Sequence, residues 1–177
     1  MEENIQKILD REKELYIPHI RTFKNKLMAW FTHCEEYQIY KFMCALRISE
    51  FYKEKNKVKY VLYMRKANRL GEKLGYFIAP GVLGQNVKLF HRSTIIVNTN
   101  SKIGNGCMFH GDNCVGNNGR DNKCPRIGNN VELGIGAKVI GDVELADNII
   151  VGANAVVTKS FLEPGITVAG IPAKKIK

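Results

Sequence analysis

The stretch IGNNVELGIGAKVIGDVELADNIIVGANAVVTKSF, from Ile127 to Phe161, repeats an aliphatic residue at every sixth position. The repeated residues are Ile127, Leu133, Val139, Leu145, Val151 and Val157. A position four residues after each is small or apolar, at Val131, Ala137, Val143, Ile149 and Ala155. A six-residue step does not match the 3.6-residue helical period and is too short for a helix-turn-helix repeat. It favours a triangular coil, with one short strand and one tight turn per hexad and three hexads per turn.

No hexad can bury its apolar face alone, so stacking of the coils must make the core. Upstream, the same step runs through Leu83, Leu89 and Ile95, slips by two residues, and resumes at Val97, Ile103, Phe109 and Val115. We therefore predict a mainly β fold, a β-helix of about five coils over residues 79–170. A β-sandwich with chance spacing is the alternative, and the number of in-phase positions argues against it.

The repeat is interrupted between Val115 and Ile127, where position 121 carries no aliphatic residue. We predict that residues from about 117 to 126 form a loop outside the coils, and loops on rigid scaffolds commonly carry function. Cys107 falls at a small corner position and is expected to be buried. Cys124 lies in the predicted loop, where it is expected to be exposed.

The first 75 residues have a different composition. They hold 11 of the 16 aromatic residues, whereas 14 of the 16 glycines follow residue 75. Lys, Glu, Leu and Tyr dominate and are compatible with helices, which we predict at about 4–15, 36–54 and 57–74. The apolar patch at 27–31 is expected either to begin another helix or to be a docking surface. The predicted organisation is a helical region over 1–75 and a β-helix domain over 76–177.

Composition excludes several classes of protein. The chain has 177 residues, of which 45 % are hydrophobic, and no apolar run approaches the roughly 20 residues of a membrane span. Five cysteines without a CxxC pair predict neither a disulfide framework nor a zinc ribbon, so a reducing, cytoplasmic location is the default. The net charge of +10 is spread over both halves. A solvated basic surface explains it without nucleic acid, although such a surface also attracts anionic ligands.

The repeats, which close with PGITVAGIPAKKI at 164–176, resemble the left-handed parallel β-helix acyltransferases with hexapeptide repeats. More narrowly, LFHRSTIIVNTNSKIGNGCMFHGDNCVGNNG at 89–119 resembles the serine O-acetyltransferase branch, whose pattern also occurs in bacterial polysaccharide biosynthesis. The resemblance implies a homotrimer, and possible pairing of trimers into hexamers. It also implies that acetyl-CoA binds between neighbouring β-helices and that the acetyl group passes to a hydroxyl.

Acetyl transfer from a thioester to a hydroxyl needs a base, donors for the developing oxyanion and alignment of the reactants. The resemblance places the catalytic base at His91, with His110 as the second candidate. His19 and His33 lie in the helical half and are expected to be surface or interhelix residues. The resemblance places coenzyme A contacts at Gly116, Asn117, Gly119, Gly134, Ile135, Ala153, Lys174 and Lys175.

The sequence departs from the serine enzymes at the acceptor pocket. Phe90 and Phe77 stand where those enzymes have carboxylates, and Lys123-Cys124 stands where they have an Arg-His pair. The predicted acceptor contacts are Phe77, Phe90, Asn113 and Lys123. We therefore predict an O-acetyltransferase acting on a sugar hydroxyl in surface polysaccharide biosynthesis.

Three alternatives stay open. The first is a serine O-acetyltransferase of cysteine biosynthesis, and the second is a non-catalytic trimeric scaffold. The third is a metal hydratase of the carbonic anhydrase type, which needs three histidines around zinc. Only His91 and His110 fall in the predicted β-helix, so no metal is expected.

Overall fold

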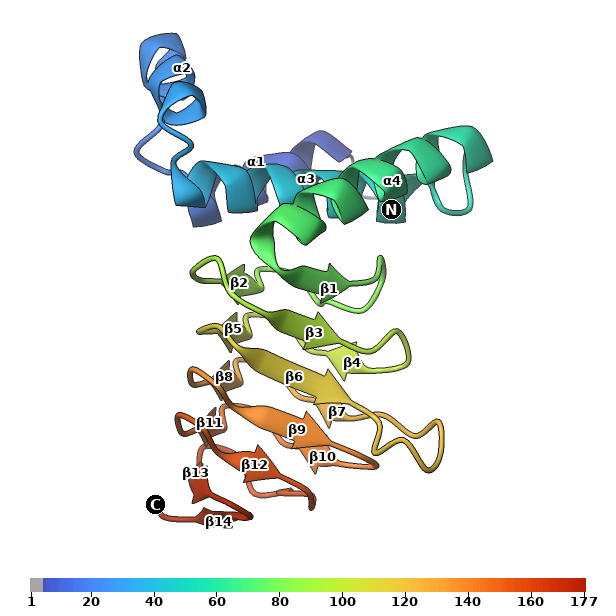
Figure 1. The fold of residues 1–177 in the computed structure, drawn as a ribbon, viewed down its shortest axis with the longest axis vertical. Coiled ribbons are helices and arrows are strands. Elements are labelled where there is room, and N and C mark those ends of the chain that lie inside the picture. The colour runs from blue at the N-terminus through green and yellow to red at the C-terminus, as the bar shows by residue number, and fades with distance from the viewer. Residues whose placement is uncertain (1–4) are drawn as a thin grey trace. The chain divides into compact units, whose positions relative to one another are not determined.

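The computed structural model describes residues 5–177, which divide into two compact units at the Leu74–Gly75 boundary (Figure 1). The first unit holds four helices within this range: α1 (Ile5–Tyr16), α2 (Phe23–Phe31), α3 (Glu35–Tyr52) and α4 (Lys57–Leu74). The predicted first position of the first helix, residue 4, lies outside the described residues. The apolar patch at 27–31 is helical, because it forms the second half of α2. No helix within 5–177 is long and apolar enough to cross a membrane.

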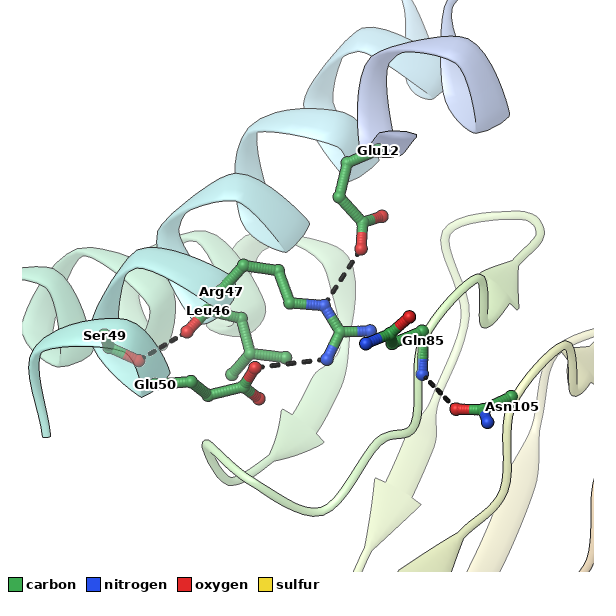
Figure 2. A network of polar contacts seen from close by, with 7 residues as sticks. All are labelled: Glu12, Leu46, Arg47, Ser49, Glu50, Gln85 and Asn105. Atoms are coloured by element: carbon green, nitrogen blue, oxygen red, sulfur yellow. Dashed lines mark hydrogen bonds and ion pairs between the residues drawn. The ribbon is translucent and has the colours of Figure 1, made fainter. Parts of the chain in front are cut away.

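The helical unit packs around α3. The apolar stripe of Ile39, Phe42, Met43 and Leu46 is fully buried. Beside it, Arg47 Nε donates to Glu12 Oε1 of α1 at 2.9 Å, and Arg47 Nη1 donates to Glu50 Oε2 at 3.1 Å (Figure 2). Arg47 and Glu12 are also buried, so this ion pair ties α1 to α3 within the core.

The second unit is a parallel β-helix of fourteen short strands. They are β1 (Tyr76–Ile78), β2 (Lys88–Leu89), β3 (Ile95–Val97), β4 (Lys102–Ile103), β5 (Met108–Phe109), β6 (Asn113–Gly116), β7 (Arg126–Ile127), β8 (Glu132–Leu133), β9 (Lys138–Ile140), β10 (Glu144–Leu145), β11 (Ile150–Val151), β12 (Val156–Val157), β13 (Thr167–Gly170) and β14 (Ala173–Lys175). They form three sheets, in the orders β1-β3-β6-β9-β12, β10-β7-β4 and β14-β13-β11-β8-β5-β2. Pairing is parallel throughout these sheets, apart from the antiparallel closing pair β13–β14. The coils begin at Tyr76, three residues before the predicted start.

The predicted hexad residues form the core. Every in-phase aliphatic residue is buried, from Leu83 to Val157. Leu133 stacks on Val151 eighteen residues later, as one coil requires. Leu89 stacks on Phe109 after twenty residues, because the predicted two-residue slip lies between them. Val115 stacks on Val139 after twenty-four residues, so the intervening loop adds six residues to its coil.

One corner of the coils is held by a ladder of side-chain oxygens. Gln85 N donates to Asn105 Oδ1 at 2.8 Å (Figure 2), Asn105 N to Asn129 Oδ1 at 2.9 Å, and Asn129 N to Asp147 Oδ1 at 2.7 Å. Each Asx side chain thus satisfies a backbone donor of the preceding coil that the turn leaves unpaired.

Removing one step of this ladder should have a modest, local cost. We expect Asn129→Ala to lower the free energy of unfolding by about 1 kcal/mol, since it deletes one acceptor for a coil-corner amide. Urea unfolding followed by far-UV circular dichroism measures this. Lys102→Ala, at an exposed strand position, is the matched control, and equal stability of the two variants would contradict the role of the ladder.

Candidate functional site at a corner of the beta-helix

One corner brings both predicted catalytic histidines onto successive coils. Phe90 follows β2, His110 follows β5 and Gly134 follows β8. These residues are equivalent, because Phe90 N donates to Phe109 O at 2.9 Å and His110 N donates to Leu133 O at 3.1 Å. His91 is the next residue along the first of these coils and is exposed.

The side chains of this corner stack on one another. The Phe90 ring lies parallel to the His110 imidazole, with centroids 4.6 Å apart and an interplanar angle of 6°. The Lys88 ammonium lies 5.1 Å from the centroid of the Phe90 ring. The Phe90 ring therefore packs against the His110 imidazole and fixes its orientation.

Glu132 completes the corner, and sequence reasoning missed it. Its Oε1 lies 2.8 Å from His110 Nε2, and each side chain is 34 % exposed. The direction of the contact does not meet hydrogen-bond geometry, so it is a close polar contact and not a hydrogen bond. Glu132 stands at an outward strand position next to buried Leu133, where a solvated residue is the ordinary expectation. Only the coil register, which pairs Glu132 with Met108 of the preceding coil, could have indicated its place beside His110.

Side-chain hydroxyl groups hold the backbone around His91 in place. Tyr76, which is buried, places its hydroxyl 2.8 Å from Phe90 O and 2.9 Å from His91 O. Ser93 Oγ lies 3.3 Å from the same His91 carbonyl. These contacts hold the turn that carries the exposed imidazole. They restrict the conformation of the backbone on either side of His91.

Asn113, a predicted acceptor contact, is buried inside the coil. It is 1 % exposed, and its Oδ1 accepts from Gly111 N at 2.9 Å. Its Nδ2 donates to Gly134 O at 2.8 Å and to Ala137 O at 3.3 Å. Both amide protons are thus used inside the coil. In this chain Asn113 therefore braces the corner near His110, and its acceptor contact stays a prediction.

The predicted loop spans 117–125, between β6 and β7, and protrudes from the coils (Figure 1). Lys123 Nζ lies 2.8 Å from Asp142 Oδ2. This contact raises the pKa of Lys123 and lowers the pKa of Asp142. Asn117 Nδ2 donates to Asp121 O at 2.9 Å, which braces the loop. Cys124 is buried, because the chain returns to the coil there, and its predicted exposure was wrong.

The remaining predicted contacts lie at several places. The corner of His110 continues on the next two coils. Gly134 and Ile135 follow β8 there, and Ala153 lies just after β11. The side chain of Ile135 is exposed. Gly116, Asn117 and Gly119 lie at the other end of β6 and in the loop. Phe77 is exposed on β1, in register with Ile96 of β3. Lys174 and Lys175 lie on β14, where Lys175 pairs with Glu163 at 2.8 Å.

Comparison with known proteins shows which proteins this chain resembles. Residues 124–159 match the family described as bacterial transferase hexapeptide (six repeats). A serine acetyltransferase from Synechococcus elongatus is 31 % identical over 105 residues, which are 58 % of this chain and 43 % of that protein. A putative colanic acid biosynthesis acetyltransferase from Escherichia coli K12 is 35 % identical over 96 residues, 53 % of this chain and 59 % of that protein.

The solved structures show the same fold. A soybean serine acetyltransferase apoenzyme superposes with a TM-score of 0.76 at 19 % identity, over 97 % of this chain and 69 % of that one. A serine acetyltransferase in complex with CoA gives a TM-score of 0.70 at 20 % identity, over 97 % and 69 %. The left-handed parallel β-helix and the resemblance to hexapeptide-repeat acyltransferases are therefore confirmed. The chain spans about half the length of the curated relatives it matches.

Proposed function

We propose that this protein is an acetyltransferase that moves the acetyl group of acetyl-CoA to a carbohydrate hydroxyl, as in surface polysaccharide biosynthesis. The observation that carries the proposal is the corner itself. Exposed His91 stands on a braced turn beside the Phe90–His110–Glu132 stack. Histidine is the side chain that most often serves as a general base in catalysis.

In the proposed reaction, His91 takes the proton of the acceptor hydroxyl while its oxygen attacks the thioester carbonyl carbon. The tetrahedral intermediate collapses with cleavage of the carbon–sulfur bond. The CoA thiolate leaves, and the proton on His91 returns to the sulfur. The products are the acetyl ester and CoA, so no metal or redox partner enters the balance.

Small residues leave room for the donor beside the histidines. Below His110, the equivalent positions are Gly134 and Gly152, followed by exposed Ile135 and Ala153. A Cβ at Gly134 would lie 2.7 Å from Ala153 N, so this glycine is also required by coil stacking. The resulting strip accommodates an extended chain such as pantetheine. Lys174 is exposed and is offered as a contact for the CoA phosphates.

The residues predicted to contact the acceptor favour a carbohydrate hydroxyl over free serine. A zwitterion needs partners for both charges, because an unpaired charge in a closed site costs several kcal/mol. Lys123 already faces Asp142, and Phe77 and Phe90 supply aromatic surface where carboxylates would grip the ammonium. Aromatic faces suit the apolar face of a sugar ring. Serine remains the second candidate, because serine acetyltransferases stand among the relatives.

Acceptor kinetics decide between the two. We expect carbohydrate acceptors, including nucleotide-linked sugars, to give the highest kcat/KM in a panel that also contains serine, with CoA release as the readout. Serine as the best acceptor, with every sugar inert, would contradict the carbohydrate assignment and leave the transferase assignment intact. The absence of CoA release with every acceptor in the panel would favour a non-catalytic scaffold.

Activity should require assembly. On one chain, the loop residues Gly116 and Gly119 lie at the opposite end of β6 from His110, so one chain offers only part of a donor groove. We expect a homotrimer, which may be tested by analytical ultracentrifugation alongside activity over a dilution series. A fully active monomer would contradict the shared groove.

A further inference from the structure

The helical unit leaves a large apolar surface uncovered. On α2, Phe23 is 82 % and Phe31 75 % exposed, and Leu27 and Trp30 are each more than half exposed. These four residues fall at helical spacing on one stripe. Two apolar residues at helical spacing on α4 are also exposed, Val58 at 69 % and Leu62 at 59 %. Trp30 and Leu62 line the same cavity, so the exposed apolar residues of the two helices meet there, and large exposed apolar patches mark interaction sites.

A cavity next to this stripe is lined by cations. It has a volume of about 630 Å³ and is bounded by Trp30 and Leu62 together with Lys41, Arg65, Lys66 and Arg69. Within residues 5–177, none of these four cations is ion-paired to a carboxylate. Instead, Lys41 lies 5.2 Å from the centroid of Tyr37 and Lys66 lies 5.8 Å from that of Tyr63.

The positive charges around the cavity repel one another. The pKa of Lys41 is lowered, first by burial and then by the positive charges of Lys66 and Lys73. Over their full lengths, α2 and α4 carry eight lysines and arginines and one carboxylate, Glu72. An anion in the cavity would relieve this repulsion, so the charge selects a negatively charged partner.

We propose that α2 and the adjacent face of α4 form a membrane-surface docking site, in which anionic lipid headgroups meet the basic cavity and the aromatic stripe enters the bilayer interface. A short helix with Phe, Trp and Leu on one face and basic residues around it has the composition of an interfacial helix. A second copy of the chain fits less well, because a symmetric contact would place this basic surface against itself. A small phosphate compound would fill the cavity and leave the apolar stripe exposed.

Trp30 is the single tryptophan of the chain, so its fluorescence reports on this surface directly. The full chain is mixed with vesicles of phosphatidylcholine alone or of phosphatidylcholine with phosphatidylglycerol. We expect a shift of Trp30 emission to shorter wavelength and co-sedimentation with the anionic vesicles. Affinity should exceed that for neutral vesicles by about tenfold or more, and it should fall with added salt.

Substitution then tests the cavity. Arg65→Gln with Arg69→Gln should lower affinity for anionic vesicles by about tenfold or more, since each cation near an anionic surface contributes separately. Lys102→Gln with Lys159→Gln makes the same charge change in the β-helix unit and should alter affinity less than about twofold. Far-UV circular dichroism checks folding, and the salt dependence of the unmodified chain tests the same point without substitution.

Several outcomes would overturn the proposal. They are the absence of an emission shift with anionic vesicles at low salt, and equal affinity for neutral vesicles. A shift that grows with protein concentration alone would assign the surface to a second copy. A shift caused by inorganic phosphate without vesicles would assign the cavity to a small anion, and one caused only by a single-stranded oligonucleotide would assign it to nucleic acid.

Discussion

We expect the His91→Ala variant to lose turnover by about 10²–10⁴-fold while its affinity for acetyl-CoA changes little. The imidazole is proposed as the base that removes the acceptor proton, and His91 is not among the residues predicted to contact CoA. The turn that carries it is braced through Tyr76 and the carbonyls of Phe90 and His91, so alanine should leave the corner in place. Steady-state kinetics and acetyl-CoA titration measure the two quantities separately.

Two matched variants locate the effect. His19→Ala removes an exposed histidine of the helical unit and should leave turnover unchanged. His110→Ala should cost less than His91→Ala, because His110 is already engaged by Phe90 and Glu132. Near-normal turnover of His91→Ala, together with a severe loss in His110→Ala, would transfer the base assignment to His110.

The largest effect on stability should come from Arg47. Its side chain is 7 % exposed and lies between Glu12 and Glu50. We expect Arg47→Met to lower the free energy of unfolding of the helical unit by about 3–5 kcal/mol, since it leaves a carboxylate buried without its partner. Urea unfolding followed by Trp30 fluorescence measures this, because that residue belongs to the helical unit. Glu12→Gln with Arg47→Met removes both charges and should recover much of the loss.

The effect of Arg47→Met should depend on pH with a defined sign. Burial raises the pKa of Glu12, and the Arg47 guanidinium opposes that rise. Without Arg47 the pKa of Glu12 rises further, so the folded variant holds a proton that the unfolded chain has lost. Its stability is then greatest below the usual value of 4.5 and falls as pH increases through the folded-state pKa. A stability deficit that is independent of pH would show that Glu12 does not titrate in this way.

The β-helix could be predicted because its periodicity is local. Each inward residue, such as Leu133 or Val139, follows the previous one by six residues. The two-residue slip before Val97 is visible in the same pattern. The pairing of His110 with Glu132 was not predictable in this way. It depends on the stacking of successive coils across an insertion that changes their offset, and Glu132 alone resembles a solvated residue.

Burial also separated residues that share a sequence pattern. Asn113 was predicted to face the acceptor, but its amide satisfies carbonyls of the next coil, which only the three-dimensional register supplies.

The apolar stripes of α3 and α4 have the same helical spacing. That of α3 is buried, whereas Val58 and Leu62 of α4 are exposed. Periodicity identifies an apolar face, and tertiary packing decides whether the chain itself covers it.

The central claim is acetyl transfer to a carbohydrate hydroxyl at the His91 corner. Mass spectrometry of the acceptor, after incubation with acetyl-CoA and the full chain, tests it most directly. We expect the carbohydrate to gain the mass of one acetyl group in an alkali-labile ester, with product formation nearly abolished in His91→Ala. An unmodified carbohydrate together with O-acetylserine from a parallel incubation with serine, or equal product from the His91→Ala protein, would contradict this account.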